Sequence, residues 1–408
     1  MSRRVVVTGM AGISPLGNDW SAVHDKLKSY TNAIVPMADW AQYEGLNTQL
    51  GSVAAPFALP THYNRKTTRS MGRVALMATR ATELALDDAG LLGDPLVRSG
   101  RMGIAYGSSS GTPASMGDFG RMINFRKTDG INATTYIKMM SHTAAVNIGV
   151  FFGMTGRVIT TSSACTSGSQ GIGYAYEAIK SGRQTAMVAG GAEELDATEA
   201  AVFDTLFATS LKNDTPTLTP RPFDAARDGL VLGEGAGTLI LEDYEHARAR
   251  GARIHAEIVG YATNCDGTHV THPNPETMQI AMRLALDDAG LPPAAIGYVN
   301  AHGTATEQGD MAESEATHAV FGSRMPISTL KSYMGHTLGA CGALEAWMSI
   351  EMMRAGWFAP TINLDTPDPR CAPLDYLMHE GRLLDCDYIM SNNFAFGGIN
   401  TSLIFKKC

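Results

Sequence analysis

The stretch SSACTSGSQG, residues 162–171, places one thiol, that of Cys165, among small residues. It stands between a short apolar run at 158–160 and a segment with a helical pattern at 172–182. A sulfur at the start of a helix lies near unpaired backbone N–H groups and the positive end of the helix dipole, which lower its pKa. Small neighbours also leave room for a substrate. We therefore predict that Cys165 is a nucleophile with a depressed pKa.

Three further segments carry side chains that could assist this nucleophile: NAHGTATEQGD (300–310), STLKSYMGHTLGACGALEA (328–346) and NNFAFGGIN (392–400). Taken singly, each has an ordinary interpretation, because a lone Cys is most often a small buried hydrophobe. Together, the thiol and the imidazoles of His302 and His336 make a nucleophile with donors for a developing oxyanion. We expect Asp310 on the helix that follows His302, not as its orienting partner. This favours a nucleophile with an oxyanion hole over a Cys-His-Asp hydrolase.

An internal repeat predicts how these residues meet. LALDDAGL occurs at 84–91 and again at 284–291, and CTSGSQG at 165–171 aligns with HTLGACG at 336–342. Such matches can arise by chance in turns between strands and helices, but two in the same order favour duplication. A pseudo-twofold axis would then place Cys165 and His336 at equivalent helix starts. We expect one half at residues 1–250 and the other at 251–408, in one compact body.

The composition restricts the class of protein. The chain has 408 residues, of which 44% are hydrophobic, and a net charge of -8. This charge argues against nucleic acid as a partner, because no positive excess is available for phosphates. The apolar runs are strand-sized, so we expect no membrane span. The six cysteines show no paired spacing, which argues against a metal site or a disulfide framework and fits a reducing cytoplasm.

The motifs, in order along the chain, resemble those of the β-ketoacyl-(acyl carrier protein) synthases of type I/II, in the thiolase-like superfamily. The resemblance is carried by VVVTGMAGISPLG, ACTSG, RPFDAARDGLVLGEGAG, NAHGTATEQGD, KSYMGHTLGACGALEA and NNFAFGGIN. It implies an α/β fold in which two duplicated βαβαβαββ halves pack as a five-layer αβαβα sandwich. It also implies a dimer, with residues 131–152 near the interface and the partner either a second copy or a homologous subunit.

The resemblance also implies a mechanism. Cys165 would accept an acyl group from phosphopantetheine, which arrives on the acyl carrier protein, so we expect neither a metal nor a dissociable cofactor. His302 and His336 would bind the thioester oxygen of a malonyl group as CO2 leaves. The resulting carbanion would attack the acyl group on Cys165. Phe396 would gate the acyl pocket and contribute its backbone N–H to the oxyanion hole, and Lys331 and Glu345 match a supporting polar pair.

Other matching positions imply substrate and partner contacts. We expect the substrate to meet Thr304, Thr306, Ser110, Thr134, Phe394 and Gly397. We expect the acidic carrier protein to dock on Arg65, Lys66, Arg69, Arg126, Lys127 and Lys212, although a solvated basic face is the ordinary alternative.

The chain departs from the family pattern near the acyl pocket. FAFGGIN has Ala395 in place of a glycine, which should restrict the movement of Phe396, and Ile399 in place of a threonine. Ser110 and Thr134 stand where bulky apolar or aromatic residues are common, which suits a long, rigid or conjugated acyl chain. Two pathways therefore stay open: fatty-acid elongation, or a specialised type II pathway for an aryl polyene or polyketide.

Two other readings are disfavoured by the motifs. A catalytically silent chain-length factor would lack the nucleophilic cysteine, whereas this chain has Cys165 and both histidines. A thiolase would use a second cysteine near the carboxyl end, where this chain has Phe396.

Overall fold

The computed structural model describes residues 2–408, which fold into two halves of the same design. The first half has five main strands: β1 (Val5–Ile13), β4 (Met102–Gly107), β5 (Val158–Thr161), β6 (Ala186–Glu193) and β8 (Gly235–Asp243). The second half has five main strands in turn: β9 (Ala256–Cys265), β10 (Ile296–Asn300), β11 (Pro326–Ser328), β15 (Tyr388–Ala395) and β16 (Ile399–Lys407).

The topology of the two halves confirms the duplication. Numbered within its own half, each set of strands follows the spatial order 3-2-4-5-1. In both halves the first three strands of that order pair in parallel, and strand 5 pairs antiparallel with both of its neighbours, strands 4 and 1. The halves join where β1 pairs with β9, with Val5 opposite Ile258, so the strands form one continuous sheet. Repeated topology of this kind indicates two copies of one ancestral unit.

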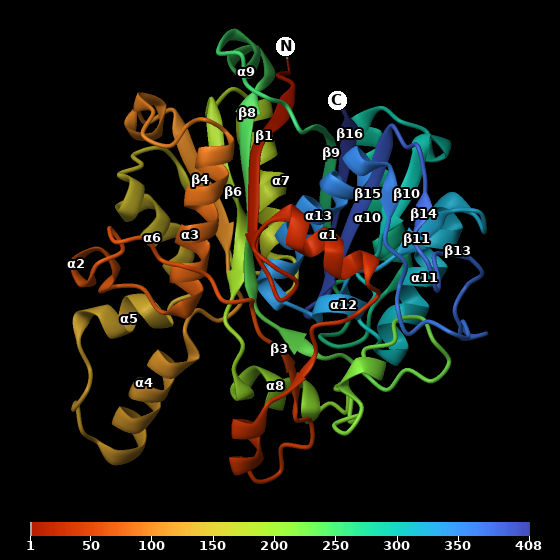
Figure 1. The fold of residues 1–408 in the computed structure, drawn as a ribbon, viewed down its shortest axis with the longest axis horizontal. Helices are drawn as coiled ribbons and strands as arrows, with labels where there is room; N and C mark the ends of the chain where they lie inside the picture. Colours follow the sequence, from red (N-terminus) through yellow and green to blue (C-terminus); the bar gives the residue numbers. More distant parts are fainter. Residues whose placement is uncertain (1) are drawn as a thin grey trace.

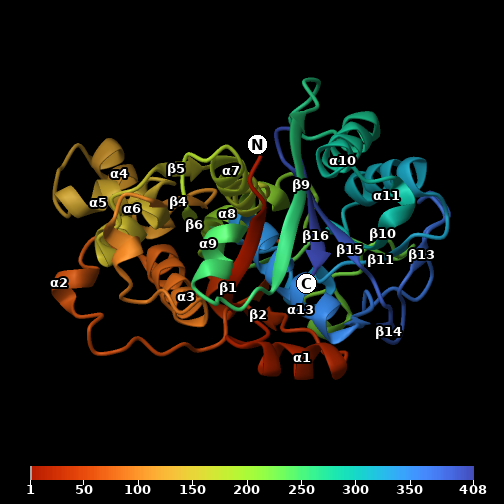
Figure 2. The ribbon, with the colours of Figure 1, turned by 90° about the horizontal axis from the view of Figure 1, so that it is seen from above.

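Helices separate and cover the two halves of the sheet (Figures 1 and 2). The helices α7 (Ser167–Lys180) and α13 (Cys341–Ala355) lie between them and pack on each other and on strands of both halves. One outer face is covered by α3 (Arg73–Asp88) and α6 (Thr143–Phe152), and the other by α10 (Pro275–Ala289) and α11 (Glu307–Phe321). This is the predicted five-layer αβαβα arrangement.

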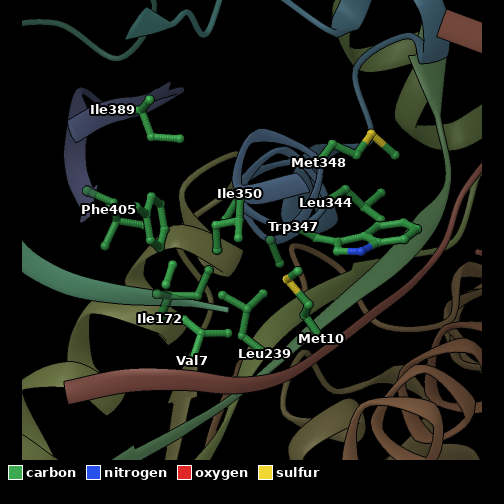
Figure 3. Close-up of a cluster of buried hydrophobic side chains, with 14 of the residues drawn as sticks. Val7, Met10, Ile172, Leu239, Leu344, Trp347, Met348, Ile350, Ile389 and Phe405 are labelled. Carbon is green, nitrogen blue, oxygen red and sulfur yellow. The ribbon is translucent and has the colours of Figure 1, made fainter. Parts of the chain in front are cut away.

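The largest apolar cluster holds these layers together (Figure 3). It combines side chains of the central helices, such as Ile172 and Trp347, with Leu239 of the first half and Ile389 and Phe405 of the second. All five are buried. Because one cluster draws on both halves, we expect them to unfold as one unit.

Two repeated glycines let the central helices begin close together. A Cβ on Gly168 would lie 2.9 Å from the carbonyl oxygen of Gly339, and a Cβ on Gly342 would lie 2.7 Å from the backbone nitrogen of Ser169. Only a residue without a side chain fits such an approach. The glycines shared by CTSGSQG and HTLGACG therefore have a packing role: they bring the two helix starts, and the residues just before them, to one place.

The remaining elements are insertions and connections. They include the helices α1 (Trp20–Lys28), α2 (Arg65–Thr68), α4 (Pro113–Phe125), α5 (Ala133–Met139), α8 (Ala197–Asp204), α9 (Tyr244–Ala249) and α12 (Lys331–Met334). Short strands complete them: β2 (Val35–Pro36), β3 (Leu50–Ser52), β7 (Leu232–Gly233), β12 (Trp357–Phe358), β13 (Asp375–Tyr376) and β14 (Arg382–Leu383). Within residues 2–408, no helix has the length and apolar character that a membrane crossing requires.

Candidate active site

Cys165 and His336 meet between the two halves, as the repeat predicts, and His302 joins them there. Cys165 follows a tight turn in which Ala164 has a left-handed φ of 50°, and it directly precedes α7. Its Sγ lies 2.9 Å from Nε2 of His336, with which it shares a hydrogen bond. The rings of His302 and His336 stand 5.1 Å apart, centre to centre, at an interplanar angle of 89°. One substrate atom can therefore meet the thiol and both imidazoles.

The environment of Cys165 differs from the sequence-based prediction in one respect. Burial raises the pKa of its thiol to about 11. Backbone hydrogen bonds from Phe396 and from Cys165 itself, and the positive charge of Lys331, lower the pKa by less. The expectation of a depressed pKa is therefore wrong, because loss of solvent outweighs the helix terminus. A buried thiol of this kind is activated by an adjacent base, and His336 is placed to accept its proton.

Both histidines are neutral at neutral pH. Burial holds the pKa of His302 and of His336 well below the usual value, and the charge of Lys331 lowers both further. A neutral imidazole carries one N–H and can donate it to a developing negative charge. Each ring can therefore donate one hydrogen bond to an oxyanion while it remains neutral.

Lys331 and Glu345 form a buried ion pair beside this site. Lys331 begins α12 and Glu345 lies on α13, and their side chains are hydrogen-bonded and shielded from solvent. Although burial alone would lower the pKa of Lys331, the Glu345 carboxylate raises it, so the ammonium stays charged. Asn393 of β15 donates a further hydrogen bond of 2.7 Å to Glu345. The predicted polar pair thus exists, and it acts on the site through its charge.

Two acidic residues of α11 hold the loop that carries His302. Glu313 accepts hydrogen bonds of 2.7 Å from the backbone N–H groups of His302 and Gly303. Asp310 accepts bonds of 3.1 Å from the N–H groups of Thr304 and Ala305. Asp310 therefore lies on the following helix, as expected, and orients backbone instead of the imidazole. The sequence analysis missed Glu313, although its position one turn after Asp310 placed both on one helix face.

A cavity of about 540 Å³ leads to the three central residues. Among the predicted substrate-binding residues, Thr304, Thr306 and Phe394 line it, and so does Phe396. The hydroxyls of Thr304 and Thr306 lie 2.9 Å apart, and the Phe394 ring packs edge-on against His302. The cavity thus brings the two threonine hydroxyls and the nucleophile Cys165 to one space.

Phe396 closes the cavity on the side of α8. Its ring packs edge-on against that of Phe203, with the centres 5.2 Å apart. The left-handed backbone that follows is supplied by Gly397 and Gly398, and Gly397 donates a hydrogen bond of 2.9 Å to the carbonyl oxygen of Val270. Ala395 ends β15 in an extended conformation, so its Cβ is accommodated in this closed arrangement.

Ser110 and Thr134 are not among the residues that line this cavity. Ser110 follows β4 and donates a hydrogen bond to Glu199 of α8. Thr134 begins α5 and borders a separate hollow on the surface, together with Arg65, Lys66, Thr68, Arg69 and Lys138. Four basic side chains thus gather around Thr134.

The other predicted docking residues are more dispersed. Arg126 and Lys127 are exposed just after α4. Lys212 donates to the carbonyl oxygen of Ala226 and lies 3.3 Å from the carboxylate of Asp228, at the rim of the cavity. Because Asp228 offsets its charge, Lys212 contributes less to a basic surface than the sequence indicates.

The ligand atoms of Cys165, His302 and His336 lie within 4.8 Å of one another, close enough to consider a metal ion. Two ligands on a tetrahedral zinc ion would be about 3.3–3.6 Å apart, given bonds of about 2.0–2.3 Å. The 2.9 Å between sulfur and nitrogen is instead a direct hydrogen bond. The arrangement is therefore better suited to proton transfer than to metal binding.

Comparison with known proteins agrees with this geometry. Residues 2–247 match the model of the β-ketoacyl synthase N-terminal domain, and residues 255–365 that of the C-terminal domain. The chain belongs to the β-ketoacyl synthase family. It is thus a condensing enzyme of the acyltransferase type, and its thiolase-like fold is confirmed.

Individual relatives cover the whole synthase. It is 36% identical to 3-oxoacyl-[acyl-carrier-protein] synthase 2 of Vibrio harveyi, over 99% of each chain. It is 59% identical to a β-ketoacyl synthase from Burkholderia phymatum STM815 of known crystal structure, with a TM-score of 0.98 and full coverage of both chains. A ketosynthase solved in complex with its type II polyketide acyl-carrier protein is 28% identical, with a TM-score of 0.88 and full coverage of both chains.

The raised pKa of Cys165 leads to a testable pH dependence. We expect its alkylation by iodoacetamide to accelerate about tenfold per pH unit between about pH 7 and pH 10, because only the thiolate reacts. Intact-protein and peptide mass spectrometry would follow Cys165 separately from the exposed Cys265 and Cys408. A Cys165→Ser variant gives the background. A plateau already below about pH 8 would contradict the raised pKa.

The buried ion pair leads to a second prediction. Lys331→Met should lower the free energy of unfolding by about 3–5 kcal/mol, because it leaves the Glu345 carboxylate buried without its partner. The double variant Lys331→Met/Glu345→Gln should recover much of that loss, since no unpaired charge remains. Urea denaturation of the two variants and the parent chain measures the difference. Equal destabilisation in both variants would show that the charge pairing is not the cause.

Proposed function

We propose that this synthase joins an acyl group held on Cys165 to a malonyl group on acyl carrier protein, giving a 3-oxoacyl thioester. The main support is that one thiol and two neutral imidazoles converge in one cavity. The relatives named as 3-oxoacyl-[acyl-carrier-protein] synthase 2 favour fatty-acid-type elongation over a specialised pathway.

The first half-reaction loads the enzyme. Cys165 passes its proton toward His336, and its sulfur attacks the thioester carbonyl of the incoming acyl group. The negative oxygen then lies between the backbone N–H groups of Cys165 and Phe396, the same groups that hydrogen-bond the sulfur. The pantetheine thiol leaves with a proton, and a new thioester forms on Cys165. Movement of Phe396 away from Phe203 gives the acyl chain a path beyond the cavity.

The second half-reaction forms the carbon–carbon bond. Once Cys165 is acylated and no longer shares a proton with it, His336 carries its one proton on Nε2. The malonyl thioester oxygen then accepts hydrogen bonds from the N–H groups of His302 and His336 as the carboxylate leaves as CO2, and the electron pair of the broken bond forms an enolate. The enolate carbon attacks the acyl carbonyl on Cys165, and the Cys165 thiolate leaves and takes up one proton from solvent. The electrons come from the broken carboxyl bond, so the chemistry requires no metal and no dissociable cofactor.

We assign carrier-protein docking to the basic hollow of Arg65, Lys66, Arg69 and Lys138. Acyl carrier protein is acidic, so these charges would attract it and raise the rate of encounter. Arg126, Lys127 and Lys212 would extend the same contact. Thr134 borders the same basic hollow.

We assign a partner subunit to the far edge of the first half. β5 is an edge strand with unpaired backbone groups, and Ile123, Phe125 and Val150 expose large apolar side chains on the neighbouring α4 and α6. An uncovered edge beside apolar side chains favours pairing with another chain. A second copy of this chain is the occupant we propose, with a homologous subunit as the alternative.

The two half-reactions can be separated by substitution. Cys165→Gln should abolish condensation but retain decarboxylation of malonyl-carrier protein, because both histidines remain. His302→Ala should slow decarboxylation about 100-fold or more, because it removes one donor to the enolate oxygen. Release of labelled CO2 and mass spectrometry of the 3-oxoacyl product measure the two steps, with Cys408→Ala as control. Unimpaired decarboxylation in His302→Ala would overturn the enolate-stabilising role.

Charge reversal tests the docking surface. Arg65→Glu/Lys66→Glu should raise KM for acyl-carrier protein about tenfold or more at low salt, with little change in kcat. The matched control is Arg183→Glu/Arg324→Glu, which changes the net charge equally at exposed arginines outside the basic hollow. The difference in KM between the Arg65→Glu/Lys66→Glu variant and the parent should shrink as salt is added, because salt screens the charges. Steady-state kinetics at increasing salt measures this. The same KM in both double variants would place docking elsewhere.

A further inference from the structure

A second buried acid lies close to the gate of the site. Glu199 is on α8, one helical turn before Phe203, whose ring packs against Phe396. Its side chain is over nine-tenths buried. Oε1 accepts a hydrogen bond of 2.7 Å from the Ser110 hydroxyl, whereas Oε2 is buried and has no partner. The proposed mechanism gives this carboxyl group no role.

The neighbouring Glu193 holds the negative charge of the pair. Glu193, at the end of β6, accepts hydrogen bonds from the N–H groups of Ser109 (2.7 Å) and Gly339 (3.0 Å) and from the Ser108 hydroxyl (2.8 Å). These donors stabilise its carboxylate and oppose the burial that raises its pKa. Glu199 has only the Ser110 hydroxyl, and burial together with the charge of Glu193 raises its pKa well above the usual value. Glu199 is therefore the protonated member.

One oxygen of Glu199 is left without a partner. The hydrogen bond with Ser110 occupies Oε1, whichever of the two groups donates, whereas Oε2 is buried with no partner. A buried polar atom left unpaired is destabilising. A bound molecule that supplies a hydrogen-bonding group to Oε2 would remove this penalty.

We propose that Glu199 is a specificity-determining residue for the acyl chain, through a hydrogen bond between Oε2 and an oxygen substituent on that chain. On the proposed path, the acyl chain starts at Cys165 and passes between Phe396 and Phe203, and Glu199 lies one helical turn from Phe203 on α8. The substrate class is therefore an oxygen-bearing acyl group, such as a hydroxyacyl chain, in preference to a plain saturated one. This inference rests on the proposed condensation, since it concerns the acyl group held on Cys165.

A competition experiment tests the inference. The full chain is offered octanoyl-carrier protein together with an equal amount of an octanoyl primer bearing one hydroxyl group, in a series that moves the hydroxyl along the chain. Intact-protein mass spectrometry gives the ratio of the two adducts on Cys165. We expect the parent to favour at least one hydroxylated isomer about tenfold, the effect of one additional hydrogen bond.

Three variants identify the group responsible. Glu199→Leu should abolish the preference, and Glu199→Gln, which keeps an N–H donor, should retain part of it. Glu315→Leu, on the exposed side of α11, is the matched control and should behave as the parent. If the parent favours no hydroxylated isomer, or Glu199→Leu keeps the preference, the inference is wrong. In both cases Cys165 is still acylated, so the proposed function stands; absence of any adduct with all primers would instead overturn that function.

Discussion

The close approach of the starts of α7 and α13 is the constraint on which this site depends. Gly168 and Gly342 allow backbone to meet backbone there, and the residues that precede each helix region, Cys165 and His336, then come within hydrogen-bond distance. A side chain at either glycine would separate the two helix starts. The packing of the central layer and the geometry of the nucleophile are therefore set by the same contact.

Burial, which results from that packing, determines the electrostatics. It raises the pKa of Cys165 and lowers that of His302 and His336, so all three are neutral at neutral pH. The charged groups lie behind these three residues. Lys331 is paired with Glu345, and its positive charge lowers the pKa of both histidines. A neutral site surrounded by fixed charges and donors can stabilise a transient anion without solvent reorganisation. The cost is that the nucleophile must be activated by proton transfer.

The two duplicated halves have diverged in what they contribute. The first half supplies the thiol, the basic hollow at α2 and α5, and Glu199 on α8. The second supplies both histidines, the buried ion pair and Phe396. Since each half holds an incomplete set, the chemistry requires the continuous sheet and shared core that fix their relative position.

The sequence by itself determined the duplicated fold, the central trio and the ion pair, because repeated motifs and residue types at helix starts are local signals. It could not give the raised pKa of Cys165, since burial depends on every layer around the sulfur. It also missed Glu313, Glu193 and Glu199, whose roles arise from backbone N–H groups and a serine hydroxyl contributed by distant segments. Only the tertiary structure decided which acids lie beside the site. The sequence around a helical carboxylate is the same whether that carboxylate faces water or binds a neighbouring loop.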